Sequence, residues 1–325
     1  IVCTGGMLPQ QKGIREIIDR AHKFGKPVAV GGPDPSAQPE IYKDADYLIQ
    51  NEGEITIPLF LKDLAKGAKR GVYTSPDMAD MTKSPIPRYD LINFKNYLHV
   101  GVQYSRGCPF ACEFCDIIEL YGRKPRTKTS AQVITELEAL HKLKYRGHID
   151  FVDDNFIGNK GKLKKEILPA LIEWMEERKH PFSFSTEASI NLSDDEELMK
   201  SMVETVFNTV FVGIESPHEE SFIECNKIQN KNRDLIACVK KIHKSGLQVQ
   251  GGFIVGFDKD PDSIFEKLIS FIQKSGIATA MVGLLNAPRQ TKLYQRLKEE
   301  KRLLKDISGD NTDFSINFIP KMNRE

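Results

Sequence analysis

The chain has 325 residues, 40% hydrophobic and 28% charged, which is typical of a globular protein with one large domain and part of another. Its formal net charge is +1, so no global field favours nucleic acid or an anionic membrane as a partner, and no apolar run approaches the roughly 20 residues that span a bilayer. Six cysteines in a chain this long do not indicate a disulfide framework, and we expect a reducing, cytoplasmic location.

Both ends of the sequence read as interrupted elements. Residues 1–8 (IVCTGGML) are strand-like from the first position, and residues 317–325 (NFIPKMNRE) contain no terminating element. We therefore expect a fragment of a longer protein that lacks parts of two domains.

Residues 1–75 alternate between strand-like and helix-like segments. Strands are predicted at 1–6, 27–32 and 46–52, and helices at 10–26 and 56–67. This alternation is typical of part of a doubly wound α/β domain. A stretch rich in Pro, Ser and Asp then predicts a linker over residues 76–99.

Six further strands are predicted from about residue 100, with amphipathic helices between them; they lie at 102–107, 148–154, 181–189, 209–216, 247–257 and 279–288. Strands separated by helices imply parallel pairing with right-handed crossovers. We predict an α/β fold over residues 100–290, either a partial barrel or an open, strongly curved parallel sheet, with ligands at the carboxyl ends of the strands. Residues 291–325 are predicted to begin with a helix and to form the start of a truncated C-terminal domain.

Three helix starts are predicted in this region. Thr129 with Gln132 and Ser193 with Glu196 fit capping boxes. Asp260 followed by a proline fits an N-cap and first helical position.

Cys108, Cys112 and Cys115 follow the first of the six strands with the spacing C-x-x-x-C-x-x-C. A structural zinc site normally has four ligands in two separated pairs, whereas the next cysteine, Cys225, is far along the chain. Cubane iron–sulfur clusters use cysteine thiolates, usually four, so three leave one iron open for a reactant. The spacing therefore favours a 4Fe–4S cluster over zinc.

This motif, placed after the first strand of six βα units, resembles the radical S-adenosylmethionine (SAM) superfamily over about residues 100–290. The resemblance implies that the three cysteines hold a 4Fe–4S cluster whose open iron binds SAM. It also implies a one-electron donor, such as flavodoxin or ferredoxin, and cleavage of SAM to a 5′-deoxyadenosyl radical. The protein's share of such chemistry is orientation and exclusion of water.

The same resemblance implies SAM-binding residues beside the cluster and at the strand ends. Phe114 lies between two cysteines, where its backbone would reach adenine, and Asp153-Asp154-Asn155 stand where the superfamily usually has Gly-Gly-Glu. The remaining implied residues are Ser185, Glu187, Gly213, Glu215, Gly252, Ile254 and Gly256. The alternative is structural: the glycines would mark close packing, and the carboxylates would cap neighbouring segments. No catalytic residue is assigned.

Residues 1–75 resemble the second half of a cobalamin-binding domain. TGGML at 4–8 and VGGP at 30–33 match strand-end motifs that line the corrinoid tail, with Gly31 and Gly32 allowing close approach of the nucleotide. The D-x-H-x-x-G motif that supplies an axial histidine is not found in this sequence. Cobalamin is therefore implied by the resemblance alone.

Three stretches resemble one subgroup, the cobalamin-dependent radical SAM proteins with a C-terminal domain of unknown function, which includes hopanoid C-methylases; they are residues 115–129, 151–160 and 308–320. This resemblance implies methyl transfer to an unactivated carbon of a small molecule, with lipids among the candidate substrates. Two alternatives stay open: another radical SAM reaction, such as ring formation or methylthiolation, and a non-enzymatic iron–sulfur sensor or zinc module.

Overall fold

The computed structural model describes residues 1–304 and 315–322. They form two compact units, which are treated separately. The first unit contains Ile1–Lys83, Phe114–Gly122 and Asn286–Ile319. The second contains Ser84–Glu113, Arg123–Leu285 and Pro320–Glu325. The domain boundaries predicted from the sequence stay predictions, and residues 308–314 of the predicted C-terminal stretch lie outside the described residues.

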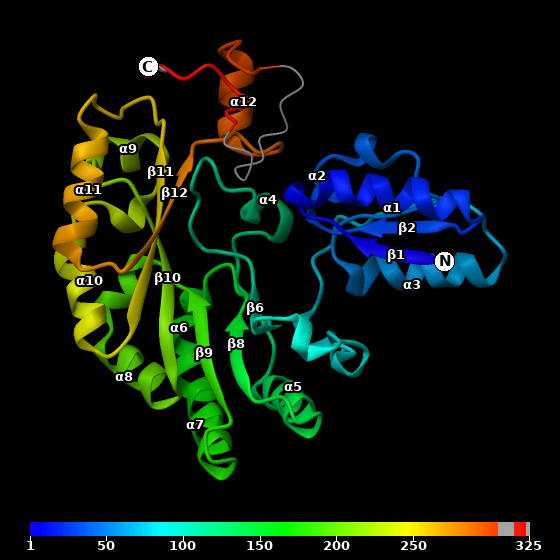
Figure 1. Cartoon of the computed structure of the whole chain (residues 1–325), viewed down its shortest axis with the longest axis horizontal. Helices are drawn as coiled ribbons and strands as arrows, with labels where there is room; N and C mark the ends of the chain where they lie inside the picture. Colours follow the sequence, from blue (N-terminus) through cyan, green and yellow to red (C-terminus); the bar gives the residue numbers. More distant parts are fainter. Residues whose placement is uncertain (305–314, 323–325) are drawn as a thin grey trace. The chain divides into compact units, whose positions relative to one another are not determined.

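The first unit is built on a parallel sheet in the order β1-β2-β3-β4, coloured blue in Figure 1. Its strands are β1 (Val2–Gly5), β2 (Val28–Gly31), β3 (Tyr47–Ile49) and β4 (Gly71–Tyr73). Its helices are α1 (Gln11–Lys23), α2 (Pro33–Ala37), α3 (Gly53–Ala65), α4 (Ile117–Tyr121) and α12 (Lys292–Glu299). Because α1 packs its apolar stripe against Val28 and Val30, while Phe60 of α3 packs against Ala29, the two helices cover opposite faces of the sheet.

The second unit is built on a parallel six-stranded sheet in the order β12-β11-β10-β9-β8-β5. Its strands are β5 (Val100–Val102), β8 (Gly147–Phe151), β9 (Phe182–Glu187), β10 (Phe207–Glu215), β11 (Gln248–Val255) and β12 (Thr279–Leu284), and a small antiparallel pair joins β6 (Ser105–Arg106) and β7 (Arg126–Thr127). Its helices are α5 (Ser130–Lys142), α6 (Lys160–Lys162), α7 (Leu168–Glu177), α8 (Glu196–Glu204), α9 (Glu219–Glu224), α10 (Leu235–Lys244) and α11 (Ile264–Ser275). The predicted α/β class with six parallel strands is confirmed.

The two faces of the six-stranded sheet differ in chemistry because side chains alternate along each strand. One face packs against the helices, which Figure 1 shows along the outer side of the sheet. Its centre is a cluster of four fully buried phenylalanines whose neighbouring rings lie 5.1–5.4 Å apart: Phe151, Phe156, Phe184 and Phe207. The other face carries polar side chains and glycine, among them His148, Asp150, Ser185 and Gly252. Ligands therefore have polar partners on the inner face.

The capping box at Thr129 is confirmed: its side chain accepts from the Gln132 backbone N–H, and the Gln132 side chain accepts from the Thr129 N–H. The prediction at Ser193 is wrong. Asp195 caps α8 by accepting from the Leu198 N–H, and the Ser193 hydroxyl donates to the Ile190 carbonyl. Residues 190–194 form a turn of 3₁₀ helix, which moves the start of α8 past Ser193.

The N-cap prediction at Asp260 is also wrong, because α11 begins at Ile264 after Ser263. Asp260 instead accepts hydrogen bonds from the backbone N–H groups of Gly256 and Phe257, at 2.9 and 3.1 Å. The carboxylate is thus engaged with the loop after β11 and with the Ser221 hydroxyl, at 2.6 Å, instead of with the helix. Among the described residues, no helix combines the length and apolarity needed to cross a membrane.

The ends of β1 and β2 meet in a close backbone contact at Gly32. Gly32 has φ 110° and ψ −177°, a conformation that essentially only glycine adopts. A Cβ added there would lie 2.8 Å from both the nitrogen and the oxygen of Gly6. Glycine is therefore required at position 32 by the backbone itself.

We expect Gly32→Ala to destabilise the protein by at least about 2 kcal/mol, because it adds a backbone clash to conformational strain. Gly67 is a matched control: its φ is 85°, and an added Cβ would meet nothing within 4 Å. Gly67→Ala should cost only about 1 kcal/mol. Denaturant unfolding of both variants measures the difference, and equal losses would contradict the role of the Gly6 contact.

Candidate functional site

The cysteine loop, residues 107–116, follows β5 and β6, and its residues 107–113, with Cys108 and Cys112, belong to the second unit at the carboxyl end of the strands. Cys112 is buried, Cys108 and Cys115 are half-buried, and all three are free thiols. In the described part of the chain, no three His, Cys, Asp or Glu side chains converge to hold one metal ion. A cubane cluster does not require its cysteines to converge on one point, because each cysteine binds a different iron.

Two adjacent carboxylates after β8 hold the segment that leads into this loop. Asp153 is 1% exposed and accepts hydrogen bonds from the Tyr104 N–H at 3.1 Å and from both the N–H and the hydroxyl of Ser105. Asp154 accepts from the Gly107 N–H at 2.6 Å, one residue before Cys108. The predicted SAM-binding pair thus positions the start of the cysteine loop.

Asp153 ionises with difficulty in this position. Burial raises its pKa to about 7, although the hydrogen bonds from Ser105 and Tyr104 oppose the shift, and the neighbouring Asp154 adds to it. The protonation state of one carboxyl is therefore coupled to the conformation of the loop.

Asn155, the third residue of that predicted trio, lies against a thiol. Its Nδ2 is 3.9 Å from the Cys108 sulfur and donates to the Ser189 hydroxyl at 3.1 Å. Burial raises the pKa of the Cys108 thiol, while the Phe110 backbone N–H and the Asn155 amide lower it. The amide thus favours the thiolate that a metal requires.

A segment that the sequence did not single out, residues 225–230, lies against the same loop. The Glu113 N–H donates to the Cys225 carbonyl at 2.8 Å, and Asn226 Nδ2 donates to the Ala111 carbonyl at 2.9 Å. Gln229 Nε2 lies 3.7 Å from the Cys112 sulfur. The sequence signal was a run of amide and cationic side chains, NKIQNKN, but nothing local linked it to cysteines more than a hundred residues earlier.

These contacts test whether the loop fits an iron–sulfur cluster. Two of the three thiols face side-chain N–H donors, as thiolate ligands of a cluster do. The Oε1 atom of Gln229 is buried without a hydrogen-bond partner in the described chain. Cys225 has its own acceptor, because its thiol donates to the Phe222 carbonyl at 3.7 Å. The donor set therefore fits a cluster held by three thiolates.

Glu215 and Lys227 form a buried ion pair beside the loop, with 2.7 Å between carboxylate and ammonium. Burial alone would lower the pKa of Lys227, but Glu215 and the nearby Cys112 raise it above its ordinary value. A Cβ at Gly213 would lie 2.5 Å from the Glu215 carboxylate. Of the predicted SAM-binding residues, Gly213 thus makes room for the pair, and Glu215 is occupied by a lysine.

Ser185 and Glu187 lie on the inner face of the sheet at the end of β9. The Ser185 hydroxyl is 2.7 Å from the Nε2 atom of His148. Glu187 keeps exposed surface on this face, but partial desolvation of its carboxylate by the surrounding protein, together with the negative charges of Asp154, Asp150 and Glu215, raises its pKa to about 7. Glu187 is available to a ligand, whereas Ser185 already has a partner.

The two predicted glycines in and just after β11 are each required for a different reason. A Cβ at Gly252 would lie 2.7 Å from the Phe211 ring, so this glycine gives the ring its space. Gly256 has φ 113°, which requires glycine, and Ile254 is half-buried between them. Phe114, in the cysteine loop, is likewise half-buried. The SAM contacts assigned to all these residues stay predictions.

Residues 123–128, which follow the cysteine loop, contain four basic side chains, and two of them have different roles. Lys128 is buried and paired with Glu136, also buried. Arg123 donates to the carbonyl of Pro109 in the cysteine loop at 3.1 Å. This run is thus partly structural and partly a support of the loop.

Gly31 and Gly32 of the first unit line a hollow of about 510 Å³ at the ends of β1 and β2. Its other walls are Cys3, Thr4, Gly5, Ala29, Ile49, Asn51, Gly53, Ile57, Phe60 and Leu61. A Cβ at Gly5 would meet only the Gly31 carbonyl, at 3.9 Å, so a side chain there would fill the hollow. Absent side chains therefore keep this space open.

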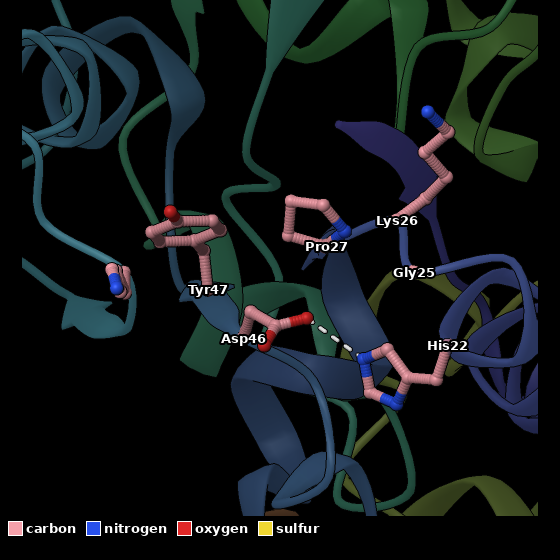
Figure 2. A pocket seen from close by; sticks show the side chains of 7 residues that line it. His22, Gly25, Lys26, Pro27, Asp46 and Tyr47 are labelled. Atoms are coloured by element: carbon pink, nitrogen blue, oxygen red, sulfur yellow. Dashed lines mark hydrogen bonds and ion pairs between the residues drawn. The ribbon is translucent and has the colours of Figure 1, made fainter.

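Figure 2 shows a different hollow, which begins where β2 and β3 start and is lined by His22, Gly25, Lys26, Pro27, Asp46, Tyr47 and Lys69. His22 and Asp46 point toward one another there, with Nε2 and Oδ2 2.8 Å apart. Burial acts to raise the pKa of Asp46, but the Val28 N–H and His22 lower it below its ordinary value. Asp46 thus holds the start of β2.

The pH dependence of stability tests the environment of Asp153. Its folded pKa of about 7 exceeds the unfolded value of about 4, so the folded state binds more protons between these values, and this group lowers stability as pH rises through them. Asp153→Asn removes this contribution. We expect the free energy of unfolding of the variant, measured by urea unfolding, to fall less steeply between pH 5 and pH 7 than that of the unmodified protein. The difference in slope is at most about 1.4 kcal/mol per pH unit. Parallel profiles for the variant and the unmodified protein would contradict the assignment.

Comparison with known proteins gives three similar examples. The chain is 46% identical, over 98% of its length and 60% of the relative, to an uncharacterized methyltransferase of Synechocystis sp.. It is 40% identical, over 98% of the chain and 60% of the relative, to the hopanoid C-2 methylase of Rhodopseudomonas palustris. The fold matches that of the radical SAM methyltransferase TsrM from Kitasatospora setae, solved with cobalamin and a [4Fe-4S] cluster, with TM-score 0.74, 14% identity, and coverage of 90% of this chain and 63% of that one.

Two family models match the sequence. A domain of unknown function, DUF4070, matches residues 291–325. The model of the radical SAM superfamily matches residues 102–272, which include the cysteine loop, the carboxylates after β8 and the 225–230 segment. More than half of the chain is thereby covered, and the expected 4Fe–4S cluster and SAM are the cofactors that this family implies. The chain belongs to the radical SAM superfamily.

Proposed function

We propose that the protein is a cobalamin-dependent radical SAM C-methyltransferase acting on an unactivated carbon of a small molecule. The chain spans 60% of the length of the two curated methyltransferases described above, so the reaction is inferred from this part. The observation that carries the proposal is the cysteine loop, fixed by Asp153 and Asp154 at the carboxyl end of the parallel sheet. The hopanoid methylase supports a lipid as substrate.

The first unit supports cobalamin as the second cofactor. Its hollow lies at the ends of parallel strands and is kept open by Gly5, as the nucleotide tail of a corrinoid would require. The structural relative TsrM was solved with cobalamin bound. No axial ligand for cobalt is assigned here, so binding would rest on the glycine-lined hollow.

The protein's part in catalysis is to hold the cofactors in position and to shield them from water. When bound, the reduced cluster would supply the electron that cleaves SAM, and cobalamin would supply the methyl group. Cys108, Cys112 and Cys115 would hold the irons, leaving one coordination position for SAM. Asp153 and Asp154 fix the cysteine loop. Glu187 lies on the inner face of the sheet, and with a pKa of about 7 its carboxyl group can exchange a proton with a bound ligand. A cytoplasmic flavodoxin or ferredoxin would be the electron donor.

The first test uses the protein at its natural length, reconstituted without oxygen with iron, sulfide and cobalamin, and then reduced. We expect 5′-deoxyadenosine to form from SAM and, with a lipid extract, a lipid that gains one methyl group. Mass spectrometry detects both products. Cys112→Ala is the control, and it should reduce both to background because one iron loses its thiolate.

The outcomes separate the alternatives. Deoxyadenosine without methylated product in the presence of a broad extract would favour a different radical SAM reaction. An intact cluster that forms no deoxyadenosine, with or without the extract, would contradict the enzyme proposal in favour of a sensor.

A further inference from the structure

Two of the three cluster cysteines face a carboxamide from a distant part of the chain. Asn155 Nδ2 lies 3.9 Å from the Cys108 sulfur, and Gln229 Nε2 lies 3.7 Å from the Cys112 sulfur. Asn155 is 3% exposed, and Gln229 and Cys112 are each 8% exposed. Water therefore competes weakly for these N–H groups, and both distances suit hydrogen bonds to sulfur.

The orientation of the Asn155 amide is fixed by its second partner. Its Nδ2 donates to the Ser189 hydroxyl at 3.1 Å, and its Oδ1 accepts from the Ser189 N–H at 3.3 Å. A reversed amide would lose the backbone hydrogen bond and turn an oxygen toward the sulfur. The nitrogen is thus held on the side of Cys108.

Gln229 is held by the segment around it. Asn226 binds the Ala111 carbonyl, and Asn230 Nδ2 donates to the Ile214 carbonyl at 2.9 Å, so both sides of Gln229 are tied to the body of the second unit. In the described chain, Gln229 Oε1 has no hydrogen-bond partner, and Gln229 Nε2 lies 3.7 Å from the Cys112 sulfur. The side chain of Gln229 is thus engaged with the Cys112 thiol through its amide nitrogen.

The nearby charge is compensated, so the two side-chain amides act on the thiolates as neutral donors, as the Phe110 backbone N–H does at Cys108. Lys227 lies in the same segment, but its ammonium is 2.7 Å from the Glu215 carboxylate, and the two charges largely cancel at a distance. Neutral N–H groups add no charge and can approach a thiolate without a counter-ion. Such donors can change the reduction potential of a cluster without changing the net charge of the site.

We propose that Gln229 and Asn155 donate N–H···S hydrogen bonds to the Cys112 and Cys108 thiolates and raise the reduction potential of the cluster. This inference rests on the proposed function, in which these cysteines hold a 4Fe–4S cluster. Reduction adds negative charge that spreads onto the sulfurs, so each donor stabilises the reduced form more than the oxidised form. The two amides are positioning and tuning residues, and they take no part in the bond-breaking step.

The test is a redox titration of the reconstituted, natural-length protein, followed by EPR of the reduced cluster. Gln229→Leu keeps most of the side-chain volume and removes the donor. At a fixed applied potential, we expect the ratio of reduced to oxidised cluster to fall about threefold, which for a one-electron couple is roughly 30 mV toward negative potential. Gln229→Glu, which places acceptor oxygens against the sulfur, should shift the potential in the same direction or further.

Asn226→Leu is the matched control. It removes a hydrogen bond from the same segment to the Ala111 carbonyl of the cysteine loop, and within the described residues the Asn226 side chain makes no hydrogen bond to a cluster cysteine. We expect weaker iron retention and, in the molecules that hold a cluster, the unmodified potential. An equal shift in Asn226→Leu and Gln229→Leu would show that loop packing, and not the N–H donor, sets the potential, and would overturn the inference.

A second readout covers the case in which Gln229→Leu does not assemble a cluster. In the unmodified protein exchanged into D₂O, double-resonance spectroscopy should detect exchangeable deuterons coupled to the cluster, and ionised Gln229→Glu should lack the one that the Gln229 amide contributes while keeping the others. A cluster without that coupling would overturn this inference while leaving the proposed function intact. Failure of the unmodified protein to assemble any cluster would instead contradict the proposed function.

Discussion

The structure of the site depends on the hydrogen bonds between the carboxylates at the end of β8 and the backbone that enters the cysteine loop. The ten residues of this loop form no helix or strand, so no regular ladder of backbone hydrogen bonds fixes its shape. Asp153 and Asp154 supply that constraint by accepting from backbone N–H groups of Tyr104, Ser105 and Gly107. Because β8 lies next to β5 in the sheet, the same strand pairing places these acceptors opposite the donors. The position of Cys108 thus follows from the sheet.

The surroundings of the loop contain more buried polar groups than a stable core needs. Asp153 and the Glu215–Lys227 pair are all largely removed from water. Burying such groups costs free energy that their partners only partly recover. Their concentration around the cysteines indicates that this region is organised for a charged cofactor at some expense in stability, while the phenylalanine cluster on the other face of the sheet provides the packing.

Local sequence patterns predicted most helices and strands, whereas the roles of individual side chains depend on contacts between residues far apart in the sequence. The six-stranded parallel sheet, three of the four first-unit strands and the Thr129 cap follow from periodicity and capping chemistry within a few residues, whereas β4 (Gly71–Tyr73) was not predicted. The caps at Ser193 and Asp260 were mispredicted because each side chain found a nearer loop partner than the helix. Residues 225–230 were missed because their contacts with the cysteine loop join positions more than a hundred residues apart. Strand-end carboxylates were assigned to SAM, yet the structure shows Asp153, Asp154 and Glu215 engaged with the protein itself.

The most direct test of the account is whether three cysteines leave one iron open to SAM. The reduced, reconstituted protein would be studied by double-resonance spectroscopy with SAM carrying isotope labels in its methionine amino and carboxylate groups. The account predicts magnetic coupling of both labelled groups to the cluster, which is lost when SAM is omitted. A reduced cluster that binds SAM without either coupling, or one whose fourth iron is held by a protein side chain, would contradict it.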